Sequence, residues 1–93
     1  MITPAQCRAA RALLDWSQQQ LAEAARIGNA TIRNFESGRS SPQNATLDVM
    51  RRAFEGAGVI FIDENEQGPG VRLRKMNPDE GRRPDQLTTE NGR

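Results

Sequence analysis

Apolar residues recur at the spacing of α-helices up to Gly56, and the pattern then changes to that of β-strands. Two helix starts are marked by capping boxes, because Thr3 with Gln6 and Ser17 with Gln20 place a hydroxyl three residues before a glutamine. The pattern therefore predicts four helices, each with one apolar face. The residues expected on those faces are Cys7, Ala10 and Leu14, then Leu21, Ala22 and Ala25, then Ile32 and Phe35, and finally Leu47, Met50 and Phe54.

A short β-hairpin is expected after the helices. Val59–Ile62 is a run of β-prone residues, and Val71–Arg74 alternates apolar and basic positions, as a half-buried strand does. The acidic stretch Asp63–Gly70, rich in turn-forming residues, joins them. We therefore predict an antiparallel hairpin whose strands are Val59–Ile62 and Val71–Lys75.

The chain divides into three parts on this basis. Residues 1–58 form a mostly α domain of about four helices, residues 59–75 form the hairpin extension, and residues 76–93 form a tail. The tail is rich in Pro, Gly, Asn and charged residues, with Leu87 as almost its only apolar anchor, so it is expected to be disordered. Trp16, the only tryptophan, is expected to pack over the first and last helices.

Composition argues against several classes of function. The chain has no apolar run of about 18 residues and no signal peptide after Met1, so a cytoplasmic protein without a membrane span is expected. Cys7 is the only cysteine and there is no histidine, which leaves no basis for an intramolecular disulfide, a zinc site or histidine-based catalysis. Gly68-Pro69-Gly70 is too short to cradle a nucleotide. We expect neither enzyme activity nor a cofactor or metal.

The stretch from Ser17 to Gly38 contains two short amphipathic helices separated by the break Arg26-Ile27-Gly28. Gly38 stands where a left-handed C-terminal cap is needed. The outward positions of the second helix carry short amides, a methyl group, a hydroxyl and a guanidinium, groups that can bind the edges of bases. These positions are Asn29, Ala30, Arg33, Asn34 and Ser37. The pattern predicts a helix-turn-helix whose second helix recognises DNA.

This segment resembles the Cro and phage-repressor class of helix-turn-helix proteins, often called the Xre family. The resemblance implies a lambda-repressor-like fold that binds double-stranded DNA. The family usually has glycine at the position of Arg26 and serine or threonine at that of Gly28, so the turn of this chain departs from the family pattern. The matching positions are Gln18, Leu21-Ala22, Ile27, Thr31-Ile32 and Glu36-Ser37-Gly38-Arg39, between flanking helices that run from about Thr3 to about Phe54.

The resemblance also indicates which residues bind DNA. Base-reading side chains of the family usually lie early in the second helix, and a glutamine at the start of the first holds the DNA backbone. The polar loop that follows the second helix suits contact with phosphates. The residues expected at the interface are Gln18, Asn29, Ala30, Thr31, Arg33, Asn34, Arg39 and Ser40. Because the net charge is only +1, the basic surface is expected to be a local patch.

A structural ion pair is a further implication of the resemblance. Arg11 and Glu36 occupy positions that related proteins often join in a partly buried pair between the first helix and the end of the recognition helix. Such a pair would fix the angle at which the recognition helix is displayed.

Two functions fit these features. The first is a transcriptional regulator that binds an inverted repeat as a homodimer, held together by the hairpin and located on the nucleoid when bound. The second is an antitoxin that binds its toxin through the hairpin or the tail from Met76. The hairpin could also cover only the core of its own domain. The residues expected at a contact between copies are Phe54, Val59, Ile60, Phe61, Ile62, Val71 and Leu73.

Overall fold

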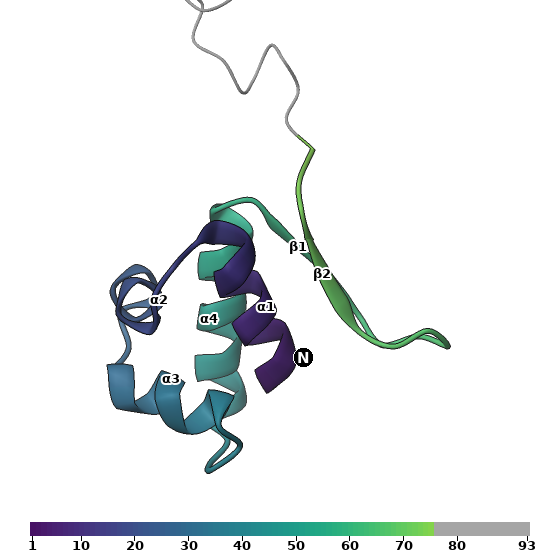
Figure 1. Ribbon diagram of the computed structural model, residues 1–93. Helices are drawn as coiled ribbons and strands as arrows, with labels where there is room; N and C mark the ends of the chain where they lie inside the picture. Colours follow the sequence, from purple (N-terminus) through teal and green to yellow (C-terminus); the bar gives the residue numbers. More distant parts are fainter. Residues whose placement is uncertain (76–93) are drawn as a thin grey trace, which may run out of the picture.

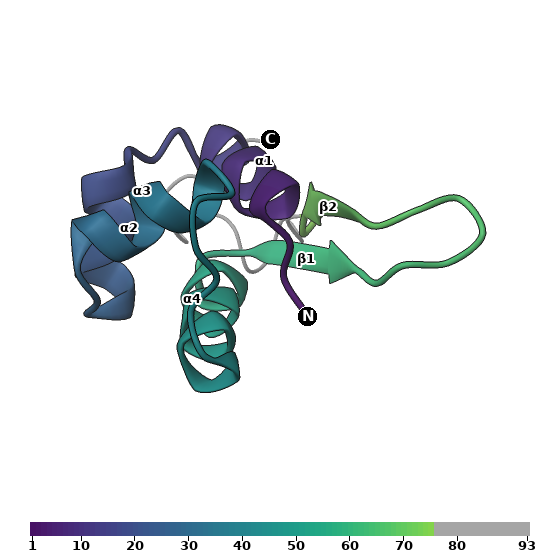
Figure 2. The same ribbon diagram turned by 90° about the horizontal axis from the view of Figure 1, so that it is seen from below.

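Within residues 1–75, four helices are followed by one β-hairpin. The computed structural model describes residues 1–75, so the expectation of a disordered tail at 76–93 lies outside the described residues. Figures 1 and 2 show α2 and α3 on one side of the molecule and the hairpin on the other, with α1 and α4 between them. The mostly α fold with a hairpin after it is thereby confirmed. The elements are α1 (Pro4–Leu14), α2 (Gln18–Ala25), α3 (Asn29–Glu36), α4 (Asn44–Gly56), β1 (Val59–Ile62) and β2 (Gly70–Leu73).

Side-chain caps fix the starts of α1 and α2. The hydroxyl of Thr3 accepts a hydrogen bond from the N–H of Gln6 at 3.0 Å, and the side chain of Gln6 accepts one from the N–H of Thr3 at 3.0 Å. Ser17 and Gln20 exchange the same two bonds, at 3.0 and 2.7 Å. Both predicted capping boxes are present, and each satisfies two backbone donors that a helix start leaves free.

The apolar faces of the helices meet in one core. Cys7, Leu21 and Ile32 come from three different helices and are fully buried in it. Trp16 is half-buried, and its ring stacks on that of Phe54 with the ring centroids 5.8 Å apart. The expectation that Trp16 packs on the last helix is therefore confirmed.

One face of the hairpin completes this core. In the antiparallel ladder, Val59 lies opposite Leu73 and Phe61 opposite Val71. Val59 and Phe61 are 1% and 8% exposed, and Phe54 on α4 is fully buried. The sequence placed these three at a contact between copies, but their side chains fill the core of the single chain and leave little surface for a partner. The expected contact residues that keep more exposed surface are Ile60, Ile62, Val71 and Leu73.

Two polar side chains tie the hairpin to the helices. The buried Gln6 on α1 donates from Nε2 to the carbonyl oxygens of Ile62 at 3.2 Å and Gly70 at 3.0 Å, and so contacts both strands. Arg51 on α4 lies over the ring of Phe61, with 5.1 Å between its guanidinium carbon and the ring centroid. Because an isolated two-stranded hairpin is marginal in water, these contacts are needed for its stability.

The second strand begins and ends earlier than predicted. β2 spans Gly70–Leu73 instead of Val71–Lys75. It begins one residue earlier because its first residue pairs with Ile62. One further backbone bond extends the pairing, from the N–H of Arg74 to the carbonyl oxygen of Gly58 at 2.7 Å.

Candidate nucleic-acid interface

The turn between α2 and α3 is closed by a residue in the left-handed region. Arg26 follows α2 with φ 60° and ψ 46°, and its N–H donates to the carbonyl oxygen of Ala22. For a residue with a Cβ this conformation costs about 1–2 kcal/mol, which glycine avoids. Gly28 is the N-cap of α3 and makes no side-chain capping bond. Both departures from the family pattern therefore affect the stability of the turn while the two helices still form.

The short helix α3 has one buried face and one exposed face. Ile32, Phe35 and Glu36 are buried against the other helices. Ala30 and Arg33 are exposed on the opposite side. The remaining predicted base-reading residues are half-buried beside them, and in Figure 2 the helix lies at the surface next to α2. These half-buried residues are Asn29, Thr31 and Asn34.

A chain of hydrogen bonds crosses from α3 to α2 on this exposed side. Arg33 Nη1 donates to Asn29 Oδ1 at 3.1 Å, and Asn29 Nδ2 donates to Gln19 Oε1 at 3.2 Å. Gln19 Nε2 then donates to Glu23 Oε2 at 3.2 Å. Because a guanidinium only donates and a carboxylate only accepts, the two ends of the chain set the orientation of both amides. No local pattern pointed to Gln19 or Glu23, since their contacts depend on how the two helices cross.

Beneath the exposed side, the carboxylate of Glu36 joins three helices. It accepts from Arg11 Nε at 2.7 Å and Nη2 at 2.8 Å, from Gln18 Nε2 at 3.0 Å and from Cys7 Sγ at 3.0 Å. The Glu36 side chain is 4% exposed and that of Arg11 is 20% exposed. Arg8 also donates to the backbone carbonyl oxygen of Glu36. The structure thus contains the ion pair that the resemblance implied, within a larger network.

This network shifts the titration of its members. Burial alone would raise the pKa of Glu36, but the hydrogen bonds from Arg11, Cys7 and Gln18 outweigh it and hold that pKa below its ordinary value. Burial, followed by the hydrogen bond to Glu36, raises the pKa of the Cys7 thiol. Cys7 is therefore a protonated donor, and it lacks the thiolate that cysteine chemistry requires.

Gln18 has a different neighbour from the one expected. The sequence assigned it to the DNA backbone, whereas the structure directs its amide nitrogen to the carboxylate of Glu36. Its oxygen and its second N–H take no part in that bond, and the side chain is only half-buried. Gln18 can therefore hold Glu36 and still offer a polar group at the start of α2.

The loop after α3 is held against the end of that helix. The backbone carbonyl oxygen of Asn34 accepts from the N–H groups of Arg39 at 2.8 Å and Ser40 at 3.2 Å. Gly38 takes φ 79°, the left-handed cap that the sequence predicted. The side chains of Arg39 and Ser40 are exposed beside the end of α3.

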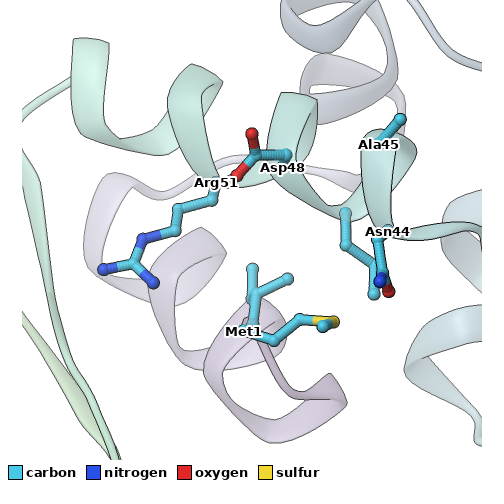
Figure 3. Close-up of a pocket in the computed structure, with 7 residues that line it drawn as sticks. Met1, Asn44, Ala45, Asp48 and Arg51 are labelled. Atoms are coloured by element: carbon cyan, nitrogen blue, oxygen red, sulfur yellow. The ribbon is translucent and has the colours of Figure 1, made fainter.

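A hollow lies where the first residues of the chain meet α4. Its volume is about 350 Å³, and its polar lining includes Asn44, Asp48 and Arg51 (Figure 3). Arg51 already forms ion pairs with Glu55 and Asp63. In the described part of the chain, no three side chains of His, Cys, Asp or Glu are grouped closely enough to bind a metal. None of the helices in the same part is long and apolar enough to cross a membrane.

Comparison with known families gives a match over the helical part of the chain. A helix-turn-helix family model matches residues 8–56, which include most of α1 and all of α2, α3 and α4. The chain belongs to the Xre/Cro-like helix-turn-helix family. It is accordingly a DNA-binding protein of the kind that regulates transcription, and its family is not one of enzymes. No curated protein matches the chain.

Proposed function

We propose that this helix-turn-helix protein is a sequence-specific regulator that binds a short inverted repeat as a homodimer and acts by occupying a promoter. The observation that supports this best is the composition of α3. Its inner face is committed to the core, while its outer face presents amides, a guanidinium and small groups next to the start of α2. A helix of this kind fits the major groove of B-DNA.

The side chains divide into those that select bases and those that hold the backbone. The amides of Asn29 and Asn34 suit paired contacts to adenine, and Arg33 suits guanine or a phosphate. Ala30 and the methyl group of Thr31 suit contact with thymine. The residues proposed to hold phosphates are Gln18, Arg39 and Ser40, with the start of α2 adding backbone donors and its positive dipole end.

A homodimer is part of the proposal because one chain contributes one recognition helix. Two half-sites on one face of B-DNA lie about 34 Å apart, one helical turn, so a second copy must supply the second helix. The hairpin supports this, because it extends from the helices on the side away from α2 (Figure 1). Its outer residues Ile60 and Ile62 are only partly covered by the chain itself.

Selection of bound sequences from a pool of random duplexes tests the function directly. The expected product is an inverted repeat bound with a dissociation constant of about 10⁻⁸ M or tighter at physiological salt. Titration of the selected site against a scrambled duplex of equal length provides the control. An affinity within about tenfold of the scrambled duplex would remove the basis for sequence-specific regulation.

A further inference from the structure

The outer edge of β2 carries backbone groups without partners. Hydrogen-bonded and non-hydrogen-bonded residue pairs alternate along an antiparallel ladder. The bond from Arg74 to Gly58 makes theirs a hydrogen-bonded pair. Counting back from Arg74, Leu73 and Val71 direct their N–H and C=O groups away from β1. Within residues 1–75 no hydrogen bond to these outward groups is present, so the edge can accept another strand.

The surface beside this edge is apolar. Leu73 is 45% exposed. Ala5, Ala9 and Leu13 are exposed as well, and their spacing of four places them on one face of α1. A hollow of about 320 Å³ lies between α1 and the start of β2, with Ala5, Ala9 and Val71 in its lining. A strand added at the edge would cover this surface.

The two ends of the hairpin carry opposite charges. The acidic residues lie in the loop 63–69, and the basic residues lie in the stretch 72–75 at the open end. Antiparallel pairing around a two-fold axis would set the acidic end of each copy beside the basic end of the other, whereas parallel pairing would set like charges together. We propose that two copies of this chain join through β2, antiparallel, into a four-stranded sheet. This interface rests on the homodimer proposed above, and it specifies the outer edge of β2 as the place where the two copies meet.

Repulsion between arginines selects one register. The outward N–H and C=O groups of residues 71 and 73 can form hydrogen bonds between the two copies when the two-fold axis passes through residue 71, 72 or 73. With the axis at residue 72, Arg72 lies opposite the partner's Arg72. With the axis at residue 73, it lies opposite the partner's Arg74. Like charges directly opposite each other destabilise a sheet. With the axis at Val71, Arg72 lies opposite the partner's Gly70, and the basic end runs along the partner's acidic loop.

Disulfide trapping tests the register. In full-length protein under mild oxidation, Val71→Cys is expected to give a covalent dimer, because Cα atoms of a hydrogen-bonded antiparallel pair lie about 5.5 Å apart, within disulfide range. Leu73→Cys, which keeps Arg72 in place and would lie opposite the partner's Pro69, is the matched control and is expected to give much less dimer. The native Cys7 is fully buried and does not compete. Efficient trapping through residue 73 and not through 71 would overturn the register.

Charge reversal tests the pairing itself. Arg74→Glu with Lys75→Glu is expected to weaken the dimer roughly tenfold, and Glu64→Lys with Glu66→Lys in the same chain is expected to restore it. Sedimentation of full-length protein at micromolar concentration measures both. A dimer indifferent to the reversal would overturn this interface while the selected inverted repeat still supported the homodimer. A monomer that selects a single half-site would overturn both.

Discussion

At the scale of single residues, the carboxylate of Glu36 is central because it accepts hydrogen bonds from the side chains of Arg11, Gln18 and Cys7. Replacing Arg11 by Met would leave this carboxylate buried without its charged partner. We expect a loss of about 3 kcal/mol in the free energy of unfolding, the lower end for buried pairs, because Arg11 keeps some exposure. Urea denaturation measures it. The double variant Arg11→Met with Glu36→Leu is expected to recover part of the loss; no recovery would mean that the pair is not coupled.

The same carboxylate makes stability depend on pH. Its pKa in the folded chain is below the ordinary 4.5, so the unfolded chain binds more protons in acid. The stabilisation is complete above about pH 4.5 and is lost as the pH falls through the folded-state pKa. Glu36→Gln is expected to be less stable at neutral pH and to lose less on acidification. Equal slopes for the two proteins between about pH 5 and 3 would contradict this.

The base-reading and phosphate-binding roles can be separated by mutation. Arg33→Ala and Asn34→Ala are expected to relax base preference, each at a cost of about 1–3 kcal/mol. Arg39→Ala is expected to weaken binding to all DNA sequences alike and to lower the dependence of log K on log salt concentration by about one unit. Binding to a panel of single-base variants at several salt concentrations distinguishes the two effects. Val49→Ala, at an exposed position of α4 that has neither role, is the control.

Gln19 belongs to this set through its contact with Asn29. Gln19→Ala is expected to relax preference at the base that Asn29 contacts, with the salt dependence unchanged.

Loss of sequence preference in Arg39→Ala, with Arg33→Ala affecting only salt dependence, would show that the protein docks on DNA differently.

At the scale of elements, the turn between α2 and α3 is the point where stability can be gained. Arg26 adopts a left-handed backbone conformation that its Cβ disfavours and that glycine adopts freely. Arg26→Gly is expected to raise the free energy of unfolding by roughly 1 kcal/mol. Arg39→Gly, at an exposed position with no such conformation, serves as the control in urea denaturation. A destabilised Arg26→Gly protein would mean that the arginine side chain contributes more than its backbone costs.

Helices were easier to predict than their mutual contacts. The capping boxes at Thr3 and Ser17 and the cap at Gly38 depend on neighbours within a few positions, so the sequence located them. Gln18 and Gln6 depend on neighbours 18 and 56 or more positions away, and their bonds to Glu36 and to the hairpin leave no local signal. The end of β2 likewise depends on a distant partner, because β1 begins at Val59 and Val59 pairs with Leu73.

At the scale of the whole molecule, the hairpin is part of the helical core, since Val59 and Phe61 are buried in it. Deleting residues 59–93 is therefore expected to give a monomer or an unstable domain that binds DNA far more weakly. Deleting only residues 77–93 is expected to leave the dimer intact. Sedimentation and thermal unfolding of both truncations check this. A dimer that survives the larger deletion would show that the copies meet elsewhere.

The two faces of α3 have a consequence for how such a protein changes over generations. Its inner residues Ile32, Phe35 and Glu36 are buried and maintain the fold, whereas Ala30 and Arg33 are exposed and contribute little to the core. With the proposed function, substitutions on the outer face would alter the preferred DNA sequence at little cost in stability, since substitutions at exposed positions usually change stability by less than about 0.5 kcal/mol. Duplicated copies of this gene could acquire separate operators by a few such substitutions while the scaffold beneath them stays the same.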